Sequence, residues 1–241
     1  MNLSQKLDTL NALRPLSADA AAEASISAAW DTNMIFESNC IEGNSLTLRE
    51  TDLVLAKGIT VSGKPLKDHL EAVNLEKAWV HVKRLAASAA DLSESDLLTI
   101  HRIVLTSVED QHAGTYRRGT VRISGSSLIL PNPMKVPDLM EQMFFDLTKI
   151  SNPLHKAAAL HHDISRIHPF ADGNGRSARL AMNFILLAVG FPPISIAPAD
   201  RVAYFQALEA ANQGNLPAFQ SFLEQQLHRE LDTWLAALQT N

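Results

Sequence analysis

The sequence predicts a mainly α-helical protein with one small β-hairpin, and three observations support this fold class. Apolar residues recur at helical spacing through most long segments. Proline or a capping residue stands where several of these segments begin. Strand-like alternation is confined to one place, where Val121 and Ile123 alternate with Arg122 and Ser124 before a Gly-Ser turn. With 241 residues, 46% of them hydrophobic, the chain can bury a sizeable core.

The expected helices begin with an alanine-rich segment near residues 18–36, which ends before residue 38. An apolar-periodic segment follows at residues 68–87. Ser93 is placed to cap the next helix, while Leu92 packs against Leu97 as a hydrophobic staple.

Proline marks the start of two later helices, because it is tolerated in a first helical turn. Pro137 begins one helix, whose inward residues are Leu139, Met143, Phe144 and Leu147. Pro217 begins a long final helix that runs through Phe222, Leu227, Leu231, Trp234 and Leu238. The chain has no internal repeat or low-complexity linker, and its one candidate boundary is the Ala/Ser-rich passage around residues 86–90.

Composition limits the classes of function. The net charge of −5, without a basic run, argues against general nucleic-acid binding. Cys40 is the only cysteine, so the fold does not depend on an internal disulfide. Residues 1–20 lack a continuous apolar run and do not resemble a secretory signal, and no segment is apolar enough to span a membrane. We therefore expect a cytoplasmic protein.

The most informative segment lies between two further helices. The first has an apolar stripe at helical spacing and ends at His168, because Pro169 cannot continue a hydrogen-bonded helix. The second carries its own stripe at Leu180, Phe184 and Leu187. Residues 173–175, Gly-Asn-Gly, should then form the turn into its N-terminus, where unpaired backbone N–H groups bind anions.

Each residue type in this segment suits a magnesium-bound triphosphate. Asp172 is a hard oxygen ligand of the kind that Mg²⁺ prefers. The two glycines of the turn let the backbone approach a phosphate without a Cβ in the way. Arg176 and Arg179 lie three residues apart, so both can grip adjacent phosphates. His168 is the natural proton acceptor.

A plain helix-loop-helix corner would explain any one of these residues alone, with His168 as a cap and the arginines solvated. Their joint occurrence favours a site instead. Two arginines near a helix N-terminus are unfavourable for the helix dipole unless an anion lies there.

Residues 168–179 resemble, position by position, the HPF-x-DGNGR-x-x-R signature of Fic proteins, which transfer AMP from ATP to protein hydroxyls. The resemblance extends from about Trp30 to Leu223 and implies an all-α Fic fold with a small β-hairpin flap. It implies that His168 deprotonates the target hydroxyl and that Asp172 holds Mg²⁺. By the same resemblance, ATP is the co-substrate.

The remaining signature residues correspond to phosphate contacts in that family. Gly173, Asn174 and Gly175 match the positions that bind the α- and β-phosphates. Arg176 and Arg179 match the two that bind the β- and γ-phosphates.

A second resemblance lies upstream, where residues 38–44 look like the [S/T]-x-x-x-E-[G/N] inhibitory helix of autoregulated Fic proteins. It implies that Glu42 pairs with Arg179 and acts as a regulatory residue. A solvated Glu42 before the helix-ending Gly43 is the plainer interpretation. In some relatives this glutamate also assists removal of AMP by orienting water, so de-AMPylation is a further expectation.

Two softer resemblances complete the site. Residues 114–126 look like the family's flap, which pairs with an extended protein target by strand addition and brings Val121 and Ser124 to the nucleotide site. Tyr204 and Asn212 resemble nucleoside contacts. Tyr204 also fits a plain buried stripe with Leu208 and Ala211, and Asn212 fits a helix end before Gly214.

We expect three parts in the chain: an N-terminal helical region with the inhibitory motif (1–90), a catalytic core (91–226) and a C-terminal helix extension (227–241). The resemblance implies a protein adenylyltransferase that modifies Ser, Thr or Tyr of a target protein or of itself. Expected partners are ATP and that target, with no nucleic acid and no membrane, and relatives often self-associate into homo-oligomers.

Two alternatives remain open at this level. The side chains of His161, His162, Asp163, His168 and Asp172 are metal-ligand types, as in HD-type metal-dependent phosphohydrolases, although this leaves the glycine turn and both arginines unexplained. A non-catalytic regulatory module that binds nucleotide without turnover is the second alternative, and the presence of His168 argues against it.

Overall fold

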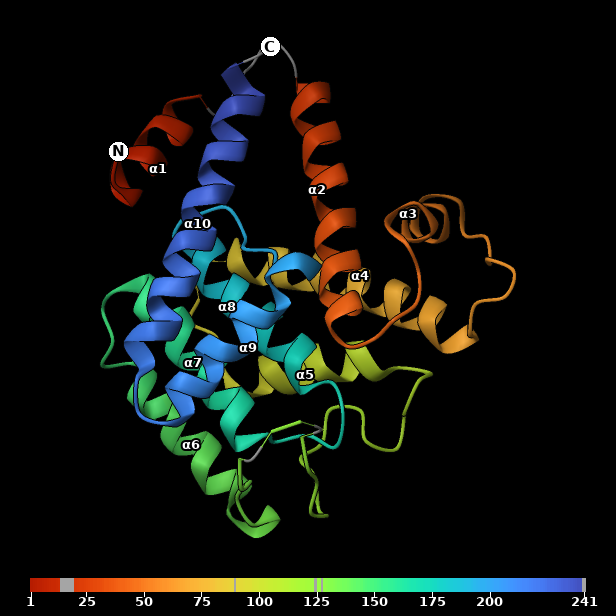
Figure 1. Cartoon of the computed structure of the whole chain (residues 1–241), viewed down its shortest axis with the longest axis vertical. Coiled ribbons are helices and arrows are strands. Elements are labelled where there is room, and N and C mark those ends of the chain that lie inside the picture. The colour runs from red at the N-terminus through yellow and green to blue at the C-terminus, as the bar shows by residue number, and fades with distance from the viewer. Residues whose placement is uncertain (14–19, 89, 124, 127, 240–241) are drawn as a thin grey trace.

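The computed structural model describes residues 1–13, 20–88, 90–123, 125–126 and 128–239, except for the side chains of residues 20–26 and 239. All regular structure in these residues is helical (Figure 1). The α-helices are α1 (Leu3–Leu13), α2 (Ala20–Ile41), α3 (Leu48–Lys57), α4 (Leu66–Ala86), α5 (Glu94–Leu105), α6 (Val136–Leu147), α7 (Pro153–Ile167), α8 (Asn174–Ala188), α9 (Arg201–Asn212) and α10 (Leu216–Gln239). Two 3₁₀-helices, η1 (Pro133–Lys135) and η2 (Pro198–Asp200), precede α6 and α9. The predicted mainly helical class is confirmed.

Helices α7 and α8 form the centre of the molecule. They pack against each other, with α4 and α5 on one side and α9 and α10 on another. Almost every residue of α8 from Asn174 to Leu186 is buried, as expected of a helix surrounded by other elements. The predicted start at the glycine turn and the predicted end of α7 at His168 are both confirmed.

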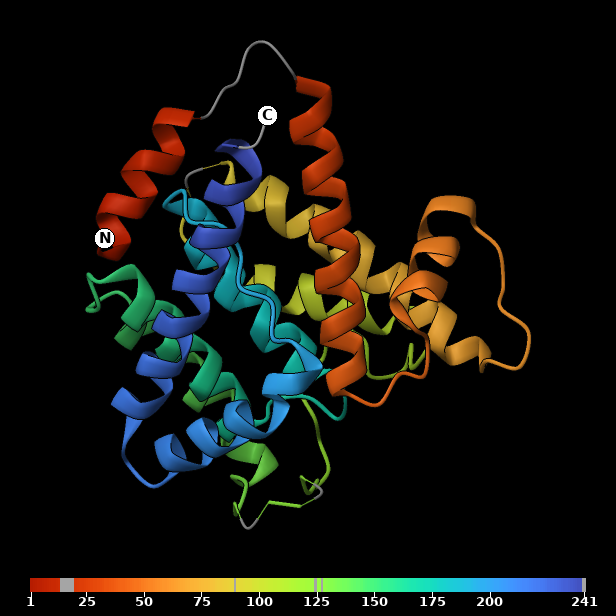
Figure 2. The same cartoon turned by 45° about the horizontal axis from the view of Figure 1, so that its top comes forward.

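The N-terminal region packs on this centre. Helix α2 descends beside α4, and its C-terminal end reaches α8 (Figures 1 and 2). The predicted end of this helix near residue 36 is wrong, because the helix continues to Ile41 and includes most of the inhibitory motif. Residues Met34, Ile35 and Ile41 are buried, so packing extends the helix beyond the alanine-rich stretch.

Two helices, α1 and α3, were not expected from the sequence. Helix α1 is short and packs mainly on α10. Helix α3 begins with a capping box, in which Thr47 and Glu50 exchange side-chain and backbone hydrogen bonds. It ends at Gly58 in the left-handed region, with φ +64°. Both signals are present in the sequence. Together with the loop that follows, α3 projects to one side of the molecule (Figure 1).

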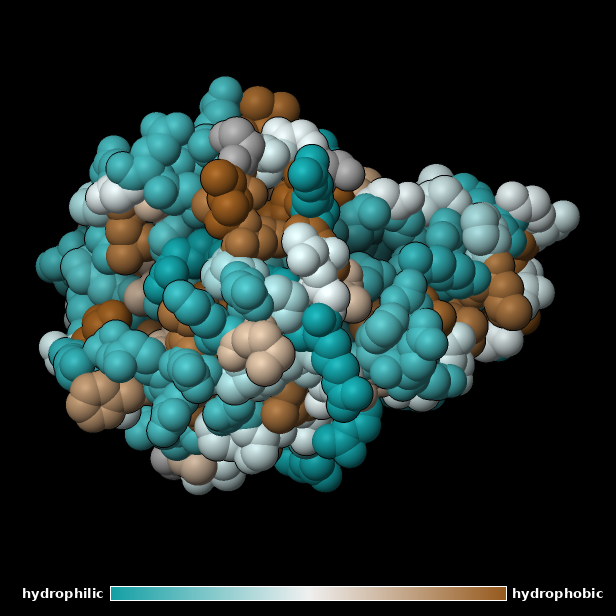
Figure 3. Space-filling model, turned by 90° about the horizontal axis from the view of Figure 1, so that it is seen from below, coloured by the Kyte–Doolittle hydropathy of each residue, from teal (hydrophilic) through white to brown (hydrophobic). Residues whose placement is uncertain are grey.

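Later helices agree closely with expectation. Ser93 caps α5, with Asp96 completing a capping box, and Leu92 and Leu97 are both buried. Pro137 lies in the first turn of α6, where Met143 and Leu147 are buried while Leu139 and Phe144 are partly buried. Figure 3 shows one face of the molecule as largely hydrophilic, with hydrophobic side chains in small separate patches. Among the described residues, no helix is long and apolar enough to cross a membrane.

The segment expected to form the flap has no strand among its described residues. Ser124, a predicted site residue, lies outside the described part of the chain. The start of the segment is nevertheless fixed beside the central corner, because the Arg117 backbone N–H donates to the carbonyl of Pro169 at 2.8 Å. The Tyr116 hydroxyl donates to Glu94 at 2.6 Å.

Candidate active site

His168 ends α7 in an uncommon backbone conformation. Its φ of +52° lies in the left-handed region, and its N–H still donates to the Ile164 carbonyl at 2.9 Å. Arg117 holds the next peptide unit, because its Nε donates to the His168 carbonyl at 2.7 Å. The same buried guanidinium also donates to the carbonyls of Gly119 and Pro131. The flap segment and the histidine are therefore fixed by one side chain.

The imidazole of His168 has one nitrogen engaged. Its Nδ1 lies 3.3 Å from the Ser165 carbonyl, which can only accept, so Nδ1 carries the proton and Nε2 has a free lone pair. Burial lowers the pKa of His168, and the charge of Arg117 lowers it further, against the opposing effects of the Ser165 carbonyl, Glu42 and Asp172. A neutral imidazole with a free Nε2 is a competent proton acceptor near neutral pH.

The loop after His168 is closed by its own residues. The Asn174 side chain accepts from the Phe170 N–H at 2.9 Å and donates to the Phe170 carbonyl at 3.0 Å. Its amide is thus used within the loop, which leaves the backbone N–H groups at the start of α8 for an anion. Gly173 has φ +76°, and a Cβ there would lie 3.3 Å from the ring of His101, so a side chain would strain both backbone and packing.

His101 supports this loop from α5, and no sequence signal singled it out. Its Nδ1 accepts from the Gly114 N–H at 3.0 Å, so its Nε2 carries the proton and donates to the Asp172 carbonyl at 3.0 Å. Its ring stacks on Phe170 with centroids 3.6 Å apart. Burial lowers the pKa of His101 to about 4, so this tautomer persists near neutral pH.

Asp172 is the acidic residue that directly precedes the glycine turn. One carboxylate oxygen accepts from the Gly173 N–H at 2.6 Å, and the other lies 3.4 Å from Arg176. The side chain is 40% exposed. A single accessible carboxylate is enough for Mg²⁺, which takes one or two protein carboxylates and completes its shell with phosphate oxygens and water. The residues present therefore fit that ion.

Arg176 is buried in the first turn of α8, with a side chain only 2% exposed. Its Nη1 lies 3.0 Å from the carboxylate of Glu71, which comes from the middle of α4 and is 8% exposed. Glu71 also accepts from Asn44, the last residue of the inhibitory motif, at 3.0 Å. No local sequence pattern marks this partner, because α4 and α8 are brought together only by the fold.

Arg179 lies one turn further along α8 and is held by α2. Its Nε donates to the Ser38 hydroxyl at 2.9 Å, and its Nη2 donates to the Ser38 carbonyl at 2.8 Å and to Glu42 Oε1 at 2.7 Å. Burial disfavours the charge of Arg179, but the Glu42 carboxylate and the Tyr204 hydroxyl outweigh it and raise the pKa of Arg179. The expected contact between Glu42 and Arg179 is present in the structure.

The Glu42 carboxylate also lies over the glycine turn. A Cβ built on Gly175 would overlap Glu42 Oε1 and lie 3.1 Å from Arg179 Nη1. A carboxylate oxygen thus stands at the N-terminus of α8, where backbone N–H groups favour an anion. Glu42 and a phosphate group would compete for this position.

The two expected nucleoside contacts are engaged elsewhere. Tyr204 is buried, and its hydroxyl lies 2.9 Å from Nε2 of His161. Asn212 ends α9, and its side-chain oxygen lies 3.1 Å from Nε2 of His162. These contacts agree with the packing and helix-end interpretations of the two residues, and their part in nucleotide binding stays a prediction. Val121 is partly buried in the flap segment.

The same contacts bear on the phosphohydrolase alternative. His161 is buried against Tyr204 and Phe219, and His162 pairs with Asn212, so neither is free to join His168 and Asp172. Within the described ranges, no group of three His, Cys, Asp or Glu side chains is placed to hold a metal ion. The HD-type ligand set is therefore not assembled in those residues.

Over its described residues the structure is all-helical, and a histidine stands beside a glycine turn at the N-terminus of a buried helix. Residues 91–186 match the model of the Fic/DOC family. The chain is 33% identical over 241 residues to "Protein adenylyltransferase Fic" from Drosophila grimshawi, and 38% identical over 211 residues to the protein of the same name from Nematostella vectensis. These alignments cover 98% and 84% of this chain but 49% and 48% of those relatives, so the chain spans about half their length.

Solved structures agree with this assignment. A Fic domain containing signaling protein from Bacteroides thetaiotaomicron has a TM-score of 0.89 and 27% identity, covering 100% of this chain and 99% of that one. Fic-1 from C. elegans has a TM-score of 0.83 and 26% identity, covering 99% of this chain and 72% of that one. Residues 91–186 therefore form a Fic/DOC-family domain within an all-helical Fic fold.

Proposed function

We propose that this protein is an adenylyltransferase that transfers AMP from ATP to a hydroxyl group of a protein. One observation carries the proposal: a neutral histidine with a free Nε2 ends α7 immediately before a glycine turn and two buried arginines at the start of α8. Relatives that cover most of this chain bear the name protein adenylyltransferase, which supports the same chemistry.

The reaction is an in-line attack of the target hydroxyl on the α-phosphorus of ATP. A new oxygen–phosphorus bond forms, the bond from the α-phosphorus to the bridging oxygen breaks, and pyrophosphate leaves with the bonding electrons. Nε2 of His168 takes the hydroxyl proton, because Nδ1 is already engaged with Ser165. His168 is therefore the catalytic base.

The rest of the site binds and orients the triphosphate. Backbone N–H groups of Asn174 and Gly175, with Arg176 and Arg179, would stabilise charge on the phosphates and on the leaving pyrophosphate, while the Gly173 N–H donates to Asp172. Asp172 would hold Mg²⁺, which when bound neutralises negative charge on the triphosphate. The chain's own contribution is thus positioning and electrostatics rather than covalent catalysis.

Glu42 acts as the brake on this reaction. It occupies Arg179 and overlies Gly175, so ATP can bind only with its γ-phosphate displaced from that arginine. The α-phosphorus is then misaligned with the attacking hydroxyl, although Glu42 does not touch it. The same carboxylate would orient water in the reverse reaction, the removal of AMP from a modified target.

The protein target would bind beside the segment that follows Arg117. Strand addition to this flap presents the hydroxyl to His168, whose position is linked to the flap through the Arg117 guanidinium. Replacing Ile123 with proline removes a backbone donor and should reduce modification of an external target more than ATP binding. Equal loss of both, measured by nucleotide titration beside target labelling, would limit the segment to a supporting role.

The decisive experiment is intact-mass analysis of the protein and of a lysate after incubation with Mg-ATP. An AMP-sized increment on the protein or on a lysate partner, abolished by His168→Ala, supports transfer. Nucleotide binding without any labelled protein, even with Glu42→Gly, would instead support a regulatory module that binds nucleotide without turnover. Release of phosphate alone would support a hydrolase.

A further inference from the structure

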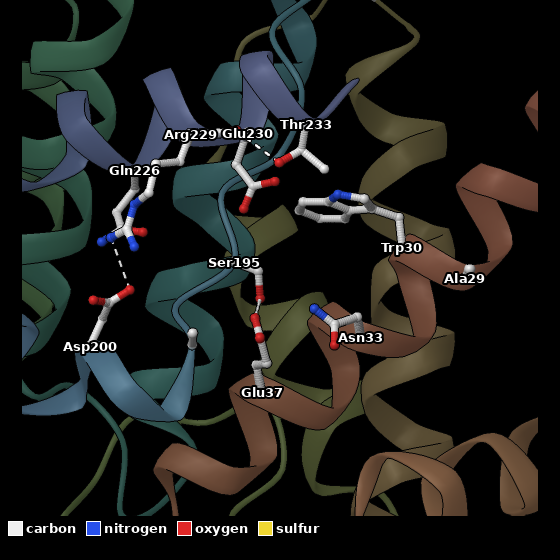
Figure 4. A pocket seen from close by; sticks show the side chains of 11 residues that line it. Ala29, Trp30, Asn33, Glu37, Ser195, Asp200, Gln226, Arg229, Glu230 and Thr233 are labelled. Atoms are coloured by element: carbon white, nitrogen blue, oxygen red, sulfur yellow. Dashed lines mark hydrogen bonds and ion pairs between the residues drawn. The ribbon is translucent and has the colours of Figure 1, made fainter. Parts of the chain in front are cut away.

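A second cleft lies away from the α7–α8 corner, between α2, α10 and the segment that leads into η2. Its volume is about 490 Å³, within the range of small-molecule sites, roughly 300–1,000 Å³. Figure 4 shows Glu230 and Glu37 on opposite sides of Ser195, with Trp30 and Asn33 to one side and Asp200, Arg229 and Gln226 to the other. None of these residues takes part in the proposed transfer reaction.

Both glutamates of this cleft lie close to Ser195. The Ser195 hydroxyl donates to Glu37, which is 9% exposed, and Glu230 lines the same cleft. Among the described residues that line the cleft, Arg229 is the only cationic side chain, and it already pairs with Asp200 at 2.9 Å. Two carboxylates therefore face one cavity without a cation of their own.

Other lining groups point to an organic ligand. The Gln226 side chain is 4% exposed and lines the cleft, yet its amide has no hydrogen-bond partner among the described residues. Trp30 supplies an indole wall of the cleft. The Gln226 amide has two N–H donors and a carbonyl acceptor, so a ligand in the cleft that accepts or donates a hydrogen bond there is favoured.

We propose that this cleft binds a small organic ammonium cation. A primary ammonium has three N–H donors, which match the acceptors of Glu37, Glu230 and Gln226. The indole of Trp30 offers a face that attracts organic cations, and Ala29 and Ala197 provide apolar contact for a carbon chain. A bare metal ion would leave this apolar lining unused.

The site also connects to the brake, a step that rests on the proposed function. Glu37 directly precedes Ser38, whose hydroxyl and carbonyl both accept from Arg179. An ammonium held between Glu37 on α2 and Glu230 on α10 stabilises the docked position of α2. It thereby favours the contact between Glu42 and Arg179, and lowers transfer by binding away from the α7–α8 corner.

Calorimetric titration with 1,4-diaminobutane, in the absence of ATP, tests the site. Saturable binding is expected, and Glu37→Gln or Glu230→Gln should each weaken it by about tenfold or more, since a charge-assisted hydrogen bond is lost. Glu224→Gln, an exposed glutamate on the same helix, is the matched control and should leave binding unchanged. Thermal unfolding of each variant shows that the fold is intact, and either glutamate variant alone suffices for the test.

A pH series gives a second readout. Burial, together with the charge of Glu37, raises the pKa of Glu230 to about 8, while the Ser195 and Trp30 donors and the charge of Arg229 oppose the shift. Glu37 has a raised pKa for the same main reason, burial, with a smaller contribution from Asp200. An ammonium pairs with the ionised carboxylates, so affinity should rise as the pH increases through about 8 and protons should be released on binding.

No heat up to about 10 mM diamine, or binding that neither glutamate variant weakens, overturns the proposal. If the cleft binds the diamine but AMP transfer by a transfer-active protein is unchanged, the link to α2 is wrong and the site stands. If the protein transfers no AMP under any condition, the proposed function fails, while the titration still decides the ammonium site independently.

Discussion

The corner between α7 and α8 and the C-terminal end of α2 meet at the N-terminus of α8 but are fixed in different ways. The corner is fixed by contacts within its own loop and by one contact from a neighbouring helix. Asn174 closes the loop on Phe170, and His101 on α5 donates to the loop. The end of α2 reaches the site through Glu42, whose side chain is 36% exposed. We propose that the corner keeps its shape during the reaction while this carboxylate leaves the site.

The two arginines of α8 show the same contrast. Arg176 pairs with Glu71, which is buried in the middle of a long helix and also binds Asn44. Arg179 pairs with Glu42, the residue after the last turn of α2 and just before Gly43. Only the second carboxylate stands where a phosphate would bind. We infer that Glu71 is a permanent partner and Glu42 a replaceable one.

Glu71→Gln should produce the largest loss of stability in this comparison. It leaves the buried Arg176 without a full counter-charge, which for buried pairs costs about 3 kcal/mol or more. Glu42→Gln removes a partner that is 36% exposed and should lower the free energy of unfolding by less, about 1.5–3 kcal/mol. Denaturant unfolding of the two variants measures both, and equal losses would contradict the distinction between permanent and replaceable partners.

His168→Ala should abolish most AMP transfer at the α7–α8 corner and leave the contact between Glu42 and Arg179 intact. Loss of a positioned base lowers transfer by roughly 10² or more, while the anion contacts that hold ATP remain. Initial rates of labelling beside nucleotide titration test this expectation. His155→Ala, an exposed histidine at the start of α7, is the control and should label at the wild-type rate. Undiminished labelling by a clean His168→Ala preparation would remove this residue from the mechanism.

Glu42→Gly should have the opposite effect, because it removes the contact with Arg179 and leaves the catalytic base His168 in place. A charge-assisted pair contributes about 1.5–3 kcal/mol, so the competent population should rise roughly ten- to a hundredfold if this is the sole restraint. The initial rate of AMP incorporation should be compared with AMP release from a pre-modified target. If only release falls, Glu42 is a hydrolytic residue and not a brake. If neither rate changes in a folded variant, the regulatory role is wrong.

The same contrast explains which features of the structure could be predicted from the sequence. The corner is formed by residues adjacent in sequence. The end of α7 at His168, the glycine turn and the start of α8 could therefore all be predicted from local patterns. The cap of α5 at Ser93 was predictable for the same reason. Helix α3 was missed although Thr47 and Glu50 carry a capping-box signal, because the helix has 10 residues and only two of them, Thr51 and Val54, are buried.

What could not be predicted depends on contacts between distant segments. Glu71 meets Arg176 across 105 positions of sequence only because α4 packs on α8. His101 supports Asp172 from α5, and no local pattern marks a histidine for that task. The pairing of Glu42 with Arg179 spans 137 positions, and it was expected only through a family resemblance.

The smallest expected effect is a change in the pKa of His168 at the α7–α8 corner when Glu42 at the end of α2 is removed. Burial holds this pKa below its ordinary value of 6.5, so the base is neutral, and transfer is retained, until the pH falls through the lowered pKa. The negative charge of Glu42 stabilises the protonated imidazole and opposes that shift. Removing Glu42 should therefore lower the pKa further and move the acid limb of the pH–rate profile to lower pH.

Measuring kcat/KM against pH for wild type and Glu42→Gly tests the direction of this shift. An acid limb at or above 6.5 in wild type would contradict the buried, neutral base, and a shift to higher pH in the variant would contradict the electrostatic link between α2 and the corner.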